Sequence, residues 1–212
     1  MNLLLTLSRF IDNVTERIGR TIYWLVLVAV LISAANATVR KIFNFSSNSF
    51  LEIQWYLFSM IFLFLAGYTL KNNEHVRIDI ITGRFSARVR AGIDIFGTLF
   101  FLLPVAILIM VLSWPLFMDS WVRNEVSTNA GGLIIWPARL MVPIGFFLLI
   151  VQAISELIKR IAFLKGMIPD PSEKHVEKTA EEQLAEEIVR SRGDLAIAAE
   201  FEAMAKGEGE KR

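Results

Sequence analysis

Four long uncharged apolar runs constrain this chain more than any other feature of its sequence. An α-helix rises about 1.5 Å per residue, so the first three runs reach roughly 27–36 Å, enough to cross a hydrocarbon core of about 30 Å. The fourth is long enough when it is extended over residues 136–157, with Arg139 reaching toward the headgroups. The runs cover residues 21–39, 53–70, 95–118 and 140–155, and each is bounded by charged residues.

Backbone polar groups cannot stay unpaired in lipid, so each run is expected to form a helix. Hydrophobic residues make up 54% of the 212 and charged residues only 20%, whereas a soluble chain is about 45–50% apolar and about 25% charged. A soluble helix bundle is the alternative, but its helices would need polar faces that these runs lack. The sequence therefore predicts an all-α integral membrane protein with four transmembrane helices.

The distribution of Lys and Arg predicts the orientation of the chain. The segments on one side of the four runs carry 11 of these residues and those on the other side carry 4, so both termini are expected in the cytoplasm. One alternative is that residues 22–32 and Ala35-Asn36-Ala37 form a cleaved signal peptide, which would leave three spans. The 20 residues before the run and its continuation to Val39 argue against cleavage.

The sequence predicts that the chain has three parts. In residues 1–20, Leu3, Leu7, Phe10, Val14 and Ile18 recur at helical spacing, which predicts an amphipathic helix lying in the cytoplasmic interface. A simple charged leader is the alternative. Residues 21–168 form the four-helix transmembrane domain. Residues 169–212, with 12 acidic and 7 basic residues, are expected to form a charged cytoplasmic tail, partly helical or disordered.

The residue types leave little basis for cofactor, metal or catalytic chemistry. Cysteine is absent, and the two histidines, His75 and His175, lie outside the apolar runs. A base at His75 oriented by Asp79 is conceivable, but no nucleophile or apolar pocket is implied beside it. A structural cytoplasmic turn is the favoured interpretation, with Ser86 capping the helix that follows. The residues assigned to this turn are Asn73, His75, Arg77 and Asp79. No enzyme activity, cofactor, metal or nucleic-acid partner is predicted.

Inside the spans, small and polar residues indicate packing more than transport. Ala29, Ser33 and Ala37 lie four apart and would allow close helix approach, and Pro104 should bend or loosen the third span. An ion-coupled carrier normally places carboxylates or broken helices near the midplane. The spans hold few such groups, which disfavours an autonomous carrier or channel. The pore candidates for that alternative are Asn36, Tyr68 and Gln152.

A set of short motifs, in this order on a four-span chain, resembles the small membrane subunit (DctQ-like) of tripartite ATP-independent periplasmic (TRAP) transporters. The resemblance runs from about Arg17 to Lys159, and the charged tail lies outside it. Its motifs are Phe43-Asn44, Ser46-Ser47, residues 52–58, Tyr68-Thr69-Leu70, Asn73, residues 75–79, Gly83-Arg84, Ser86, Arg88, Arg90, Glu125, residues 127–132 and Trp136-Pro137.

The resemblance implies a non-catalytic subunit of a sodium-coupled secondary transporter in the bacterial inner membrane. Its partners would be a large multi-span permease subunit, which carries the solute and ion sites, and a periplasmic solute-binding protein that delivers an organic acid or related solute. The small subunit would brace the large one in the lipid bilayer and help to receive the binding protein. The resemblance implies a subunit or binding-protein interface at Glu52, Gln54, Trp55, Asn129, Gly131, Gly132, Trp136 and Pro137.

Overall fold

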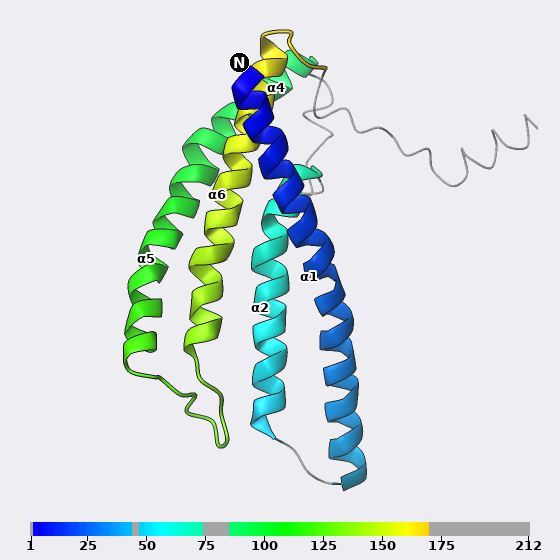
Figure 1. The fold of residues 1–212 in the computed structure, drawn as a ribbon, viewed down its shortest axis with the longest axis vertical. Helices are drawn as coiled ribbons and strands as arrows, with labels where there is room; N and C mark the ends of the chain where they lie inside the picture. The colour runs from blue at the N-terminus through cyan, green and yellow to red at the C-terminus, as the bar shows by residue number, and fades with distance from the viewer. Residues whose placement is uncertain (1, 44–46, 74–84, 170–212) are drawn as a thin grey trace, which may run out of the picture. The chain divides into compact units, whose positions relative to one another are not determined.

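Long helices account for most of the computed structural model, which describes residues 2–43, 47–73 and 85–169. These residues lie in one unit of the chain, Met1–Pro171. Four stretches within them are long and apolar enough to cross a membrane, as predicted. In chain order, the elements are α1 (Asn2–Phe43), α2 (Asn48–Lys71), α4 (Ala87–Gly97), the π-helical turn η1 (Thr98–Leu102), α5 (Leu103–Val122) and α6 (Trp136–Leu164) (Figure 1).

Helix α1 differs from its prediction in length. Its 42 residues form one continuous helix, about 63 Å long at 1.5 Å per residue. The predicted division at residue 20 into an interfacial helix and a span is therefore absent. The Leu3, Leu7 and Phe10 side chains are exposed, while the opposite polar side packs on α6 through Ser8 and Asp12. Nothing interrupts the backbone hydrogen bonds at residue 20, so the helix continues; the location of residues 1–20 in the membrane interface stays a prediction.

The third span is assembled from α4, η1 and α5 without a break. The π-helical turn at Thr98–Leu102 directly precedes Leu103 and Pro104, the first two residues of α5. Proline has no backbone N–H and its ring crowds the preceding turn, so a wider turn at this position relieves the clash. The loosening predicted at Pro104 is thus observed. Ser86 stands at the N-cap of α4 as predicted, but its side chain makes no capping hydrogen bond.

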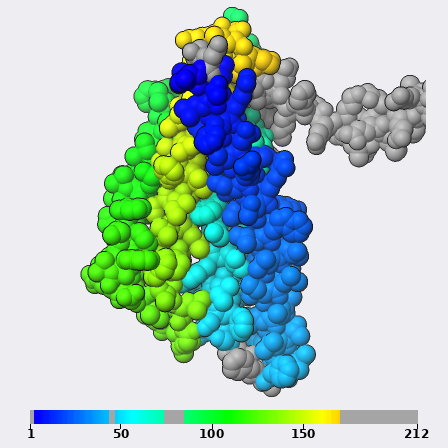
Figure 2. Space-filling model, in the orientation of Figure 1, coloured from blue at the N-terminus to red at the C-terminus, as the bar shows by residue number. Residues whose placement is uncertain are grey.

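Helix α6 is the central element of the described residues. It packs against α1, α2, α4 and α5, and Figures 1 and 2 show α5, α6, α2 and α1 as successive bands across one face. Helices α2 and α6 approach closely at Gly145, where an added Cβ would lie 2.6 Å from the Leu63 Cβ. The start of α1 and the end of α6 lie at the same end of the bundle (Figure 1), as the even number of spans requires.

The small-residue spacing in α1 is only partly used within the chain. Ala29 is buried, whereas Ser33 and Ala37 are exposed. The predicted close approach of helices therefore involves one of the three residues in the described structure.

Candidate functional site

The segment between α5 and α6 folds back onto the first turns of α2. Val126 and Ile134 form an antiparallel bridge, and Ser127 N–H donates to the Leu133 carbonyl at 2.9 Å. Gly131 lies between them with φ of 71°, in the left-handed region that glycine enters without strain. We call residues 125–135 the hairpin loop.

Glu52 is the residue on which the hairpin loop is built. Its side chain is only 3% exposed, and its carboxylate accepts hydrogen bonds from three groups of the loop. One oxygen accepts from the Ser127 hydroxyl and, at 2.9 Å, from Asn129 Nδ2; the other accepts from Leu133 N–H at 2.6 Å. Hydrogen bonds to a charged acceptor are among the stronger ones in proteins, so this carboxylate defines the shape of the loop.

Further contacts attach both ends and the tip of the hairpin loop to the helices. The Ser49 hydroxyl donates to the Gly131 carbonyl, and Asn48 Nδ2 donates to the Ala130 carbonyl at 3.2 Å. The Tyr56 hydroxyl donates to the Ile134 carbonyl at 2.9 Å. At the base of the loop, Arg139 pairs with Glu125 at 2.6 Å. The loop is thus tied to α2 and to α6, two helices that pack on each other.

The predicted interface residues fall into three groups by their exposure in the structure. Trp55 is 60% exposed, and Asn129 and Gly131 are also exposed. Glu52 and Gln54 are buried, and the Gln54 amide nitrogen has no hydrogen-bond partner among the described residues. Gly132, Trp136 and Pro137 are half-buried; the Trp136 ring packs edge-on against Trp121, with the ring centres 4.4 Å apart. Within this chain, Glu52 holds the loop on which Asn129 and Gly131 are exposed.

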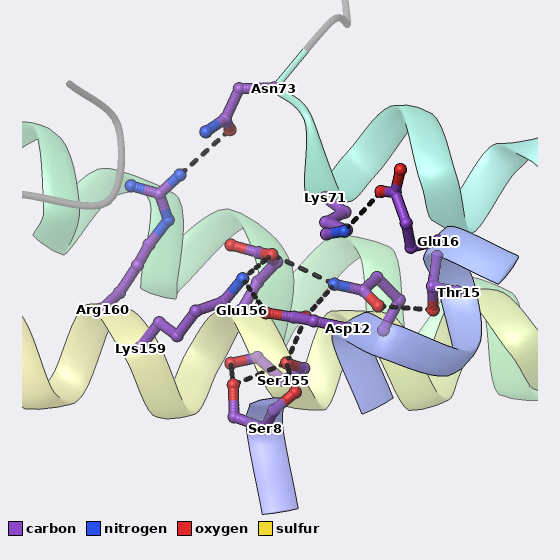
Figure 3. Close-up of polar contacts among 11 residues, drawn as sticks. Ser8, Asp12, Thr15, Glu16, Lys71, Asn73, Ser155, Glu156, Lys159 and Arg160 are labelled. Atoms are coloured by element: carbon purple, nitrogen blue, oxygen red, sulfur yellow. Dashed lines mark hydrogen bonds and ion pairs between the residues drawn. The ribbon is translucent and has the colours of Figure 1, made fainter. Parts of the chain in front are cut away.

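A second polar site lies at the opposite end of the bundle, where α1 crosses α6 (Figure 3). We call Ser8, Asp12, Thr15, Gln152, Ser155, Glu156 and Lys159 the crossing cluster. Asp12 accepts hydrogen bonds from Gln152 Nε2 and from the Ser155 hydroxyl, both at 2.9 Å, and pairs with Lys159 at 3.0 Å. The Ser8 and Ser155 hydroxyls are 2.7 Å apart.

Gln152 and Lys159 complete the crossing cluster. The fully buried Gln152 side chain accepts from the Thr15 hydroxyl at 2.7 Å and donates to Glu156 at 3.1 Å. Lys159 also pairs with Glu156 at 2.5 Å, so two carboxylates share this ammonium. Every polar group named here has a partner in the other helix or in the same turn, as burial away from water demands.

Two further ion pairs join the same end of the bundle to α2 and α4. Lys71, in the last turn of α2, pairs with Glu16 of α1 at 2.7 Å. Arg160 of α6 pairs with Asp94 of α4 at 2.7 Å. It also donates to the Asn73 side chain at 3.2 Å (Figure 3). Asn73 follows α2 with φ of 53°, a left-handed conformation that Asn tolerates better than most residues. Of the predicted cytoplasmic turn, only Asn73 is described; His75, Arg77 and Asp79 lie outside the described residues.

Sequence reasoning missed the crossing cluster. Asp12 and Glu16 were expected on the polar side of an interfacial helix, yet they pair with Lys159 of α6 and Lys71 of α2. The available signal was a matching stripe on α6, where Gln152, Ser155, Glu156 and Lys159 recur at helical spacing. Two complementary polar stripes on otherwise apolar helices indicate a contact. Gln152, a pore candidate of the autonomous-carrier alternative, is fully buried in this contact.

Across residues 2–43, 47–73 and 85–169, the fold is all-helical, with four helices able to cross a membrane and a structured loop at one end. Among the described residues, no group of three or more His, Asp or Glu side chains could hold a metal ion. A family model described as "Tripartite ATP-independent periplasmic transporters, DctQ component" matches residues 29–163. The chain belongs to this family, which confirms the resemblance seen in the motifs. Comparisons with curated proteins and with solved structures gave no match.

Proposed function

We propose that this protein is the small, non-catalytic membrane subunit of a TRAP-type secondary transporter in the bacterial inner membrane. It braces the large ion-coupled permease subunit and helps to receive a periplasmic solute-binding protein, for the uptake of an organic acid or related solute. Both termini lie in the cytoplasm, so the hairpin loop faces the periplasm.

The burial of Glu52 beneath the hairpin loop is the observation that carries the receiving role. A loop that meets a partner repeatedly binds better when its conformation is already formed, because less conformational freedom is lost on docking. The three hydrogen bonds to Glu52 provide such preorganisation. In this proposal Glu52 is a positioning residue, while Trp55, Asn129 and Gly131 contact the partner.

The bracing role is supported by the polar contacts at the other end. The crossing cluster and the Glu16–Lys71 and Asp94–Arg160 pairs link α1, α2, α4 and α6 at one level. These groups are mostly buried between the helices, so separating the helices would leave a charge unpaired. Asn73, His75, Arg77 and Asp79 are proposed to fix the cytoplasmic turn.

Affinity purification of the tagged full chain from its native membrane in mild detergent tests the proposal. We expect a large multi-span protein in roughly equimolar amount, and no catalytic turnover by the chain alone. Recovery of the chain as a lone species in several detergents would contradict the proposal and favour the autonomous carrier, with Asn36 and Tyr68 as the remaining pore candidates.

The receiving surface is tested separately with the recovered complex. Trp55→Ala should weaken capture of the solute-binding protein while leaving the large subunit bound. Trp114→Ala is the matched control, because Trp114 is also an exposed tryptophan but lies on α5, away from the hairpin loop. Equal capture by both variants and the unaltered chain would remove Trp55 from the interface.

A further inference from the structure

A groove runs between α1 and α2 on the side of the bundle that contains the Glu16–Lys71 pair. Its volume is about 560 Å³, and it is lined by Gly19, Arg20, Tyr23, Trp24, Leu65 and Tyr68, among others. Tyr23 and Trp24 form an exposed wall, with 70% and 66% of their surfaces accessible. Gly19 forms part of the floor, because an added Cβ there would overlap the Tyr68 ring. We call this space the aromatic groove.

The charges at one end of the aromatic groove do not cancel. Glu16 accepts from Arg20 Nε through one carboxylate oxygen, at 2.9 Å, and from Lys71 Nζ through the other, at 2.7 Å. Two cations therefore share one anion, which leaves one positive charge. Arg20 uses only Nε in this pair, and a guanidinium carries five N–H donors in a fork that matches phosphate oxygens.

The position of the groove along α1 corresponds to the boundary between headgroups and hydrocarbon. Residues 21–39 are uncharged, and at 1.5 Å per residue they span about 28 Å, close to the thickness of the hydrocarbon core. Arg20 and Lys71 then lie at the headgroup level. Tyr23, Trp24 and Tyr68 lie where aromatic side chains concentrate in membrane proteins. An amphipathic ligand in the bilayer would therefore have its polar part level with the positive charge and its apolar part level with the groove.

We propose that the aromatic groove binds one anionic phospholipid, with its phosphate on Arg20 and an acyl chain between Tyr23, Trp24 and Leu65. Such a lipid is the occupant that matches both the remaining positive charge and the apolar, laterally open slot. A helix of a partner protein would fill the slot but would have to bring its own anion to the level of Arg20. This lipid site is independent of the role proposed for the hairpin loop.

Native mass spectrometry of the full chain in detergent, titrated with phosphatidylglycerol or phosphatidylcholine, tests the site. We expect one phosphatidylglycerol to be retained about tenfold more strongly than phosphatidylcholine, because both lipids offer a phosphate to Arg20 but the choline cation of phosphatidylcholine is repelled by the positive charge that Glu16 leaves unbalanced. Arg20→Gln should abolish the preference. Arg123→Gln is the matched control, because Arg123 also forms an exposed ion pair with the residue four positions earlier, Asp119, and does not line the groove. It should retain the preference.

The apolar part of the site is tested with Trp24→Ala. This exposed residue can be shortened without opening the interior, so the variant is expected to fold and to bind both lipids more weakly while still preferring phosphatidylglycerol. Equal retention of the two lipids by the unaltered chain would overturn the proposal, as would an unchanged preference in Arg20→Gln. Loss of the bound phosphatidylglycerol when the large subunit is co-purified would also overturn it, because a partner helix would then occupy the groove.

Discussion

Replacing Glu52 by Gln is the sharpest test of how the hairpin loop is held. The side chain keeps its size, but one carboxylate oxygen becomes an NH₂ group. If the amide oxygen faces Ser127 and Asn129, the NH₂ faces the Leu133 N–H, which now has no acceptor. Leaving that part-buried donor unsatisfied costs about 1–3 kcal/mol, and the two remaining bonds weaken because their acceptor is neutral. We expect the loop to lose about 3 kcal/mol of local stability.

This loss of local stability can be measured as the rate of hydrogen–deuterium exchange at the Leu133 amide of the full chain. A change of about 3 kcal/mol corresponds to roughly 100-fold faster exchange, at 1.4 kcal/mol per decade. Asp119→Asn is the control at the same end of the bundle. It removes an exposed pair with Arg123, four residues away, which is worth only about 0.3–0.5 kcal/mol. If Glu52→Gln accelerates exchange no more than Asp119→Asn does, the carboxylate does not define the loop and our reasoning is wrong.

Three further predictions concern the packing of the helices. Gly145→Val should destabilise the protein by about 1–3 kcal/mol through overlap with Leu63, lowering the thermal unfolding midpoint, whereas Gly92→Ala, with nothing within 4 Å of the added Cβ, should leave it unchanged or raise it. Asp12→Ala should cost about 3–5 kcal/mol by leaving buried partners unpaired, seen as faster amide exchange in residues 5–12; exchange as slow as in the exposed-site variant Asn13→Ala would contradict this. Tyr56→Phe removes a single hydrogen bond to Ile134, so it should cost about 1 kcal/mol and accelerate exchange around Ile134 far less than Glu52→Gln does at Leu133.

The spans were predictable because lipid leaves the backbone few choices. An uncharged run of sufficient length must form a helix, and all four runs do. Their ends were less predictable: α6 continues to Leu164, beyond the predicted residue 157, because Lys159 and Arg160 have partners on α1 and α4. A charge marks the end of an apolar run, but it does not end a helix when a neighbouring helix supplies its counterion.

The candidate site was predictable in its residues and not in their roles. The motifs singled out Glu52 and Asn129, and the structure joins them directly at 2.9 Å. That Glu52 lies beneath the loop, and not on its surface, depends on how residues 77 positions apart are juxtaposed. A single sequence carries no such distance information. The crossing cluster, with partners about 140 residues apart, was missed for the same reason.

The central place of α6 has a consequence for the order in which the chain is built. Helices α1, α2 and α5 all pack on α6, which is synthesised after them. Until residues 152–160 are synthesised, Asp12 lacks Lys159 and Gln152. The partners of Asp12 in α1 are therefore supplied only when the last helix is made. A chain truncated before α6 should be degraded by the membrane's quality control. In such a chain, Asp12 of α1 would lack its partners Gln152 and Lys159.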